Sequence, residues 1–164
     1  MKVQIGFEQV FSLFLFVFSV TYLIYQLLSY YPSYTGEMRR ESIFSEAYQI
    51  SEILVNDYGD PPNWYSLPLD QIKRIGLLNE SIGKSNVLSL IKISKANEIC
   101  NSNNLNYQKF KQLLDLKNDI SFIVYLNNNV VASCTRPFGE RVVKVNRIVA
   151  FDNGSYGELV IWLY

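Results

Sequence analysis

Val10–Leu28 reads VFSLFLFVFSVTYLIYQLL and carries no charged side chain. Its only polar groups are small hydroxyls, tyrosines and one glutamine. As an α-helix rising about 1.5 Å per residue, this stretch spans the roughly 30 Å hydrocarbon core of a bilayer and satisfies its backbone hydrogen bonds internally. The sequence therefore predicts a transmembrane helix near the N-terminus of this 164-residue chain.

A cleaved secretory signal peptide is the alternative interpretation of the same stretch. The apolar region of such a signal is usually about 7–15 residues long and is followed by a small-x-small cleavage site. This run is longer, and Ser29-Tyr30-Tyr31-Pro32 supplies no such site. Tyrosines gather at the C-terminal end of the run, where an aromatic belt at headgroup level is expected. A retained, single-pass anchor is favoured over a cleaved signal.

The residues ahead of the apolar run carry a more specific pattern. Gln4-Ile5-Gly6-Phe7-Glu8, after Met1-Lys2-Val3, resembles the processing site of archaeal type IV pilin-like proteins with a class III signal peptide. The resemblance implies that a prepilin-type peptidase cuts between Val3 and Gln4 and removes a leader of residues 1–3. This chain differs from residues usual in that family at Val3, Gly6 and Gln9.

Glu8 is the acidic residue at the edge of the apolar helix. A carboxylate entering an apolar layer is costly unless a cation meets it. The family resemblance implies that the cation is the N-terminal amine of a neighbouring subunit in a filament, which makes Glu8 an assembly residue. The alternative is that Glu8 stays in the headgroup layer and bonds water.

Charge and composition exclude several classes of function. Lys plus Arg and Asp plus Glu number 15 each, without a long basic block, so nucleic-acid binding is not expected. Histidine is absent, which removes the commonest general base and transition-metal ligand. No phosphate loop, zinc-spaced cysteine cluster or nucleophile elbow is present, so we expect no enzyme activity, cofactor or metal.

The charges that flank the apolar run conflict with export of the C-terminal region. Lys2 precedes the run, whereas Arg39 and Arg40 follow it, so a simple positive-inside count does not place that region outside. The pilin-like start and the cysteines favour an extracellular C-terminal domain.

The sequence after the anchor predicts a second helical stretch. Pro32-Ser33-Tyr34-Thr35-Gly36 predicts a kink or short break. From Glu37 to Asn56, apolar residues recur at helical spacing on one face, namely Ile43, Ala47, Ile50 and Leu54. Gly59 is the expected C-cap, ahead of Pro61 and Pro62. Trp64 is expected to fill the core of the following domain, with peptide or sugar binding as the alternative.

The sequence after Trp64 predicts two short helices and two β-hairpins. The helices are Val87–Cys100 and Asn106–Leu116, separated by an Asn-rich turn. Strands are expected at Ile120–Leu126, Val130–Cys134, Arg141–Phe151 and Glu158–Leu163, with an Asn-Gly turn inside the second hairpin. Consecutive hairpins predict an antiparallel sheet with helices on one face, so the head is α+β.

The two cysteines, Cys100 and Cys134, are far apart in the sequence and form no CxxC redox motif. In an exported head they are expected to form a disulfide, which would stabilise it by roughly 3–4 kcal/mol in the chain-entropy model. Two buried free cysteines are the alternative. Asn79 and Asn153 each begin an N-x-Ser triplet in a predicted turn and are candidate glycosylation sites.

The expected organisation is a leader at 1–3, a transmembrane helix at 4–31, a helix packing on the head at 32–58 and an α+β head at 59–164. Loose similarity to uncharacterised archaeal pilin-like membrane proteins extends through Trp64, Ile72–Leu77, Leu90–Ile93 and Tyr107–Leu116. The resemblance implies a structural or accessory subunit of a type IV pilus-like surface filament. Its partners would be membrane lipid, the processing peptidase, and copies of itself or other pilins. The alternative is a membrane-tethered binding or sensor domain that does not polymerise.

Overall fold

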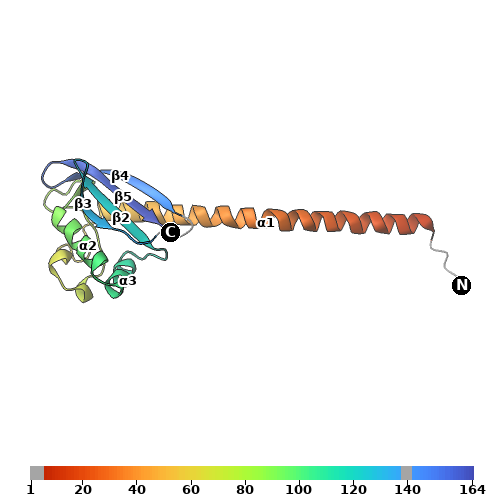
Figure 1. Cartoon of the computed structure of the whole chain (residues 1–164), viewed down its shortest axis with the longest axis horizontal. Coiled ribbons are helices and arrows are strands. Elements are labelled where there is room, and N and C mark those ends of the chain that lie inside the picture. Colours follow the sequence, from red (N-terminus) through yellow and green to blue (C-terminus); the bar gives the residue numbers. More distant parts are fainter. Residues whose placement is uncertain (1–5, 138–141) are drawn as a thin grey trace. The chain divides into compact units, whose positions relative to one another are not determined.

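The computed structural model of the chain describes residues 6–137 and 142–164. Helix α1 (Phe7–Asn56) is followed in the chain by short helices and a five-stranded sheet (Figure 1). The chain divides into two compact units, Met1–Arg39 and Arg40–Tyr164, so the last turns of α1 belong with the head. The predicted α+β class, with a long N-terminal helix, is confirmed.

The first part of α1 exposes its apolar side chains. From Phe7 to Tyr31 its large apolar residues are all surface-exposed, and the helix is long and apolar enough to cross a membrane. The α-helix continues through Pro32–Gly36, so the short break considered for this segment does not occur. Residues 10–28 thus leave a large apolar surface that the rest of the described chain does not cover.

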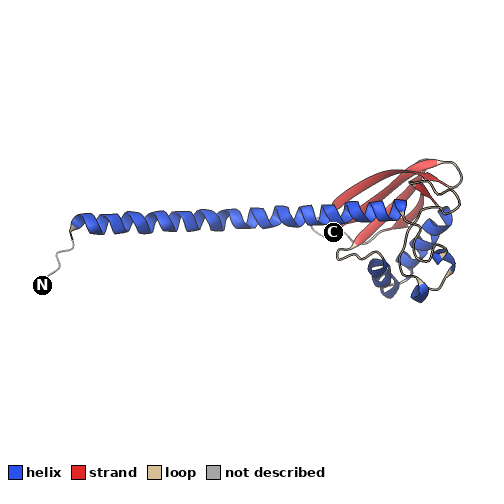
Figure 2. Ribbon diagram, turned by 180° about the vertical axis from the view of Figure 1, so that it is seen from behind, coloured by secondary structure: helices blue, strands red, loops and turns tan. Residues whose placement is uncertain are grey.

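The last turns of α1 pack on the head. Ile43, Ala47, Ile50 and Leu54 are all buried, which confirms the face predicted from helical spacing. Figure 2 shows these turns running alongside the strands. This part of α1 is therefore a core helix of the head.

The turn after α1 is built around Trp64. Trp64 is fully buried and its Nε1 donates to Gly76 O at 2.9 Å, which confirms the predicted core position. Gly59 is not the C-cap, because α1 already ends at Asn56. Instead, Gly59 has a positive φ of 84°, and a Cβ there would lie 2.4 Å from the Trp64 ring. Glycine is thus needed at 59 to admit the indole.

The two short helices differ from the predicted ranges. Helix α2 covers Leu90–Ser102 and α3 covers Asn104–Leu113. Val87 and Leu88 form the short strand β1, paired in parallel with β4, rather than the first turn of a helix. The Asn-rich turn is much shorter than predicted: Asn103 alone separates the helices and caps α3 by accepting from Asn106 N at 2.8 Å.

The remaining strands are β2 (Ile120–Leu126), β3 (Asn129–Cys134), β4 (Val143–Phe151) and β5 (Tyr156–Leu163). Their order is β1-β4-β5-β2-β3. Both predicted hairpins are present, and the antiparallel pairing of β2 with β5 joins them into one sheet. The sheet is mixed rather than purely antiparallel because β1 adds a parallel edge.

One face of the sheet holds the core. The register places Cys134, Phe122, Ile161 and Val145 in one row across four strands, and all four are buried. On this face Phe110 of α3 stacks on Phe122, with ring centroids 6.0 Å apart. Helix α2 contacts the same face through the Cys100–Cys134 bond, and the last turns of α1 contact it through the bonds of Arg147 to Ser51 and Glu52.

Candidate functional site

Glu8 lies in the first turn of α1 and is solvent-exposed. It shares a shallow surface groove with Ser12 and Phe16. Within residues 6–137 and 142–164, its carboxylate has no ion-pair partner. A negative charge at a helix N-terminus is favoured by the helix dipole, but no side chain in this range neutralises it. The predicted processing residues Val3 and Gln4 lie outside the described residues.

Arg147 of β4 fastens the last turns of α1 to the sheet. Its Nε donates to Ser51 Oγ at 2.9 Å, and its NH2 forms an ion pair with Glu52 at 2.5 Å. The guanidinium also lies over the Tyr48 ring, 4.5 Å from the centroid. Three side chains at neighbouring positions on one helix face therefore bind one arginine, which holds the last turns of α1 on the sheet.

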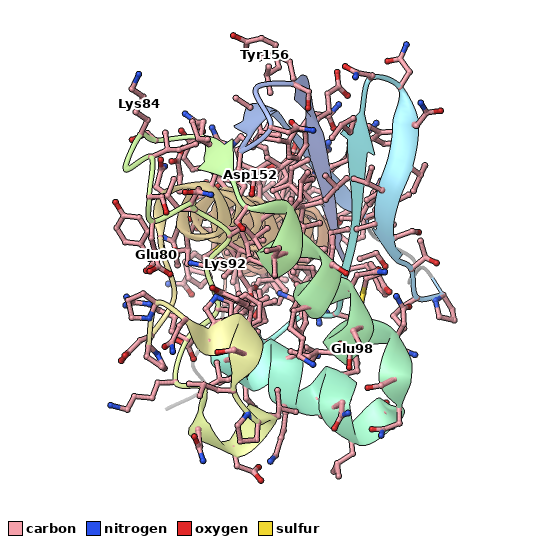
Figure 3. The ribbon with its side chains drawn as sticks, turned by 90° about the vertical axis from the view of Figure 1, so that its left-hand side faces the viewer. Glu80, Lys84, Lys92, Glu98, Asp152 and Tyr156 are labelled. Carbon is pink, nitrogen blue, oxygen red and sulfur yellow. A yellow bond between two sulfur atoms is a disulfide. The ribbon has the colours of Figure 1, made fainter. Side chains whose placement is uncertain are left out.

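Lys92 is a buried cation on α2, only 2% exposed. Its Nζ donates to the carbonyls of Tyr58 and Leu78, at 2.8 and 3.1 Å, and to Glu80 Oε1 at 3.1 Å. Figure 3 shows Glu80 and Lys92 side by side. All three donor positions of the ammonium are used, so it binds the loop before β1 to α2. Such a saturated cation is a structural cross-link.

Tyr107 of α3 is buried against the start of β2. Its hydroxyl accepts from Ile120 N at 3.0 Å and lies 3.1 Å from Ile120 O and 3.3 Å from Asp119 Oδ1. Burial raises the pKa of the Tyr107 phenol well above its usual range, and the charge of Asp119 raises it further. The Tyr107 phenol therefore stays protonated in the folded state.

The disulfide links the end of α2 to the end of β3. Cys100 and Cys134 are bonded, with a sequence separation of 34, and both are fully buried. Arg136 lies beside the bond: its guanidinium donates to Cys100 O at 2.8 Å and covers the Tyr107 ring at 4.3 Å. The cross-link predicted for an exported head is thus present.

Two asparagines of α2 cover part of the sheet edge at β3. Asn97 Oδ1 accepts from Ser133 N at 3.0 Å, and Asn101 Nδ2 donates to Ser133 O at 2.9 Å. Because Asn97 and Asn101 are four residues apart, they lie on the same face of the helix. Both backbone groups of Ser133 are satisfied by side chains rather than left free at the edge.

The two candidate glycosylation sites differ in their surroundings. Asn79 is half-buried: its Oδ1 accepts from the backbone of Ser81 and Ile82, and its Nδ2 points to Asp152 at 3.5 Å. Asn153 lies exposed in the β4–β5 turn, where its Oδ1 accepts from Ser155 N at 3.0 Å. The Asn153 amide nitrogen is therefore the more accessible of the two.

An open pocket with a volume of about 610 Å³ lies beside the β2–β3 and β4–β5 turns. Its principal lining side chains come from three adjacent strands and one turn: Tyr125, Asn127, Asn128, Ile148, Tyr156 and Glu158. We call this the turn-end pocket. Figure 3 shows Tyr156 projecting outward, away from the Glu80–Lys92 pair.

Among residues 6–137 and 142–164, no group of three or more His, Cys, Asp or Glu side chains is placed to hold a metal ion. Lys92 and Arg147 are each bound by neighbouring protein groups, including Glu80 and Glu52, and both connect parts of the fold. The turn-end pocket has the features of a binding surface, with aromatic rings beside amide and carboxylate groups.

Comparison with known proteins gives no relative: no family model, curated protein or solved structure matches the chain.

Sequence reasoning missed several of these positions. Lys92 reads as one more exposed charge on an amphipathic helix, and only the fold surrounds it with carbonyls. The turn-end pocket depends on which residues of β2, β4 and β5 lie opposite one another, which the sequence does not specify. A usable signal was present for the edge cover, since Asn97 and Asn101 have the spacing of one helix face.

Proposed function

We propose that the chain is a structural or accessory subunit of a type IV pilus-like surface filament, anchored in the cell membrane before assembly. Its apolar helix would pack with its counterparts in the filament core, and the head would be displayed on the surface. The observation that carries the proposal is the division of α1 into two parts. The first part is apolar and exposed, and the last turns of the same helix are packed in the core of the head.

The uncovered part of α1 supports packing among helices. Aromatic and branched side chains surround it on all sides, and Ser19 and Thr21 hydroxyls bond carbonyls within the helix, at 2.8 Å each. Such a surface is stable in lipid or against other apolar helices, and unstable in water. The same surface serves an anchor before assembly and a filament core afterwards.

Glu8 supports the choice of a filament over a simple anchor. Its carboxylate stands at the start of the apolar helix without a cation in the described part of the chain. A partner supplied by another subunit would neutralise it, and pairing of this kind sets the register between neighbouring helices. The resemblance of Gln4–Glu8 to a pilin processing site points to the same partner, the N-terminal amine created by cleavage.

The head supports display outside the cell. A disulfide joins Cys100 to Cys134, and such bonds persist in oxidising compartments. Arg147 binds α1 firmly to the sheet, so a force on the helix is transmitted to the core of the head. A filament subunit needs that mechanical connection.

The test is expression in archaeal cells with an active prepilin-type peptidase. Intact mass of the mature protein should show loss of residues 1–3, and sheared surface filaments should contain the chain. Glu8→Gln should abolish filament entry while leaving the chain in the membrane. Glu37→Gln, which neutralises an exposed acid farther along α1, is the matched control and should assemble normally.

A mature chain that still begins at Met1 contradicts the processing step. Filament entry of Glu8→Gln at the wild-type level contradicts the assembly step. If the chain is displayed at the surface but is absent from filaments, the second candidate, a tethered binding domain, replaces the first. The turn-end pocket is the feature that favours that second candidate.

A further inference from the structure

The turn-end pocket is preformed by the register of three strands. Tyr125 of β2 lies opposite Glu158 of β5, and Glu158 lies opposite Ile148 of β4, so these three side chains form one cross-strand row. Tyr156 is two residues before Glu158 and shares its face of the sheet. The pocket is therefore built on paired strands, which fix the relative backbone positions of its side chains.

The β2–β3 turn completes the pocket. Asn127 and Asn128 are the two residues between the strands, and both have positive φ, 48° and 65°. That is the conformation of a type I′ hairpin turn, for which asparagine is well suited. The turn is tight and specified by its sequence, so the two amide side chains stand beside the tyrosines on a rigid support.

The lining groups are available to a ligand. Tyr156 is 71% exposed and Ile148 is 80% exposed, and both lie on the same face of the sheet beside the pocket rather than scattered singly. Within the described residues, the polar ends of Tyr125, Tyr156 and Glu158 bond no other side chain or backbone group. Apolar ring faces, amides and a carboxylate therefore converge on one open surface.

The charge of the pocket restricts the ligand. The lining contains one carboxylate, Glu158, and no Lys or Arg. Phosphate, nucleic acid and acidic sugars would meet an uncompensated negative charge there. A neutral, hydroxyl-rich ligand fits the chemistry, because amides both donate and accept and a carboxylate accepts from neighbouring hydroxyls.

The strand positions argue against a peptide that binds by strand addition. Binding of that kind requires a free sheet edge. The strands that form this pocket, β2, β4 and β5, each have a neighbour on both sides, in the order β1-β4-β5-β2-β3. Recognition must therefore use side chains that face outward from the sheet.

We infer that the turn-end pocket is a binding site for a neutral saccharide. The tyrosine rings would pack on the apolar C–H face of a sugar ring, while Asn127, Asn128 and Glu158 bond its hydroxyls. The volume of about 610 Å³ lies within the range of roughly 300–1,000 Å³ typical of small-molecule sites. The inference goes beyond the proposed filament role and requires only the folded head.

The test uses the full chain in lipid nanodiscs, which avoids detergents with sugar headgroups. Saturation-transfer NMR would be recorded with cellobiose, lactose and N,N′-diacetylchitobiose as neutral probes and with glucuronic acid as the acidic probe. At least one neutral disaccharide should receive saturation transfer, and glucuronic acid should not. Tyr156→Ala should weaken the binding at least tenfold, and Glu158→Gln severalfold.

Leu105→Ala is the matched control, because Leu105 is 72% exposed on α3, outside the pocket, and its loss should change affinity less than twofold. Tryptophan fluorescence of each variant verifies that the head is folded. No transfer to any neutral probe overturns the inference, as does equal binding by wild type and Tyr156→Ala. Preference for glucuronic acid overturns it too. Failure to form filaments would leave this result unchanged, so the two proposals can fail separately.

Discussion

Removal of the Cys100–Cys134 disulfide should lower the stability of the head substantially. The bond closes a loop with a sequence separation of 34, for which the chain-entropy model gives a stabilisation of about 4 kcal/mol at 25 °C. For a head of about 125 residues (40–164), the entropy of unfolding near 60 °C is roughly 0.26 kcal/mol/K. The loss should therefore lower Tm by roughly 15 °C.

The assay is equilibrium urea unfolding of the Cys100→Ala/Cys134→Ala variant in nanodiscs. Trp64 and Trp162 both lie in the head, so tryptophan fluorescence reports unfolding of the head alone. Wild-type protein in reductant provides a second comparison, because it lacks the bond but keeps both buried sulfur atoms. The two should unfold at similar urea concentrations, well below the oxidised wild type.

A loss of less than about 1 kcal/mol in both samples would refute the reasoning, because loop closure would then contribute little to the free energy of unfolding. A large loss in the double variant with no loss in reduced wild type would also refute it. That result would assign the effect to the cavity left by two buried side chains. Reductant should not change the double variant.

Three further predictions concern the head. The free energy of unfolding of the wild type, relative to that of Tyr107→Phe, should fall by about 1.4 kcal/mol per pH unit above the unfolded pKa of 10.0. The reason is that the raised pKa keeps the Tyr107 phenol protonated in the native state, whereas the unfolded state loses the proton. Urea unfolding of both proteins between pH 9 and 11 measures this, and a constant difference would contradict it. Lys92→Met should destabilise the head by about 1–3 kcal/mol, since two buried carbonyls and Glu80 lose their donor. An unchanged urea midpoint would show that the cation is dispensable. In a host that adds N-linked glycans, glycopeptide mass spectrometry should find Asn153 occupied and Asn79 unmodified, and the reverse pattern would contradict the accessibility argument.

Local signals predicted much of the fold. The bounds of β2 follow from a β-branched and aromatic run ended by asparagines, and the buried face of α1 follows from helical spacing. The core position of Trp64 follows from its large apolar ring, which favours burial. These features depend on neighbouring residues or on burial alone, which a single sequence records.

Features that depend on distant partners were missed. Val87 and Leu88 form a strand only because Ala150 and Phe151 lie beside them. The sequence predicts a helix cap at Gly59, whereas the contact with Trp64 that requires a glycine there exists only in the folded turn. The turn-end pocket likewise needs the cross-strand register of Tyr125, Glu158 and Ile148. The sequence contains these residue types but does not show which of them lie together in the fold.

The asparagine pair on α2 has a consequence for crowded surfaces. Asn97 and Asn101 occupy the hydrogen-bonding groups of Ser133, and the opposite edge of the sheet is the two-residue strand Val87–Leu88. Neither border offers a long row of free amides and carbonyls to another copy. Copies of the head held close together would therefore meet mainly through side chains, because each edge leaves only a short stretch of backbone free for strand addition.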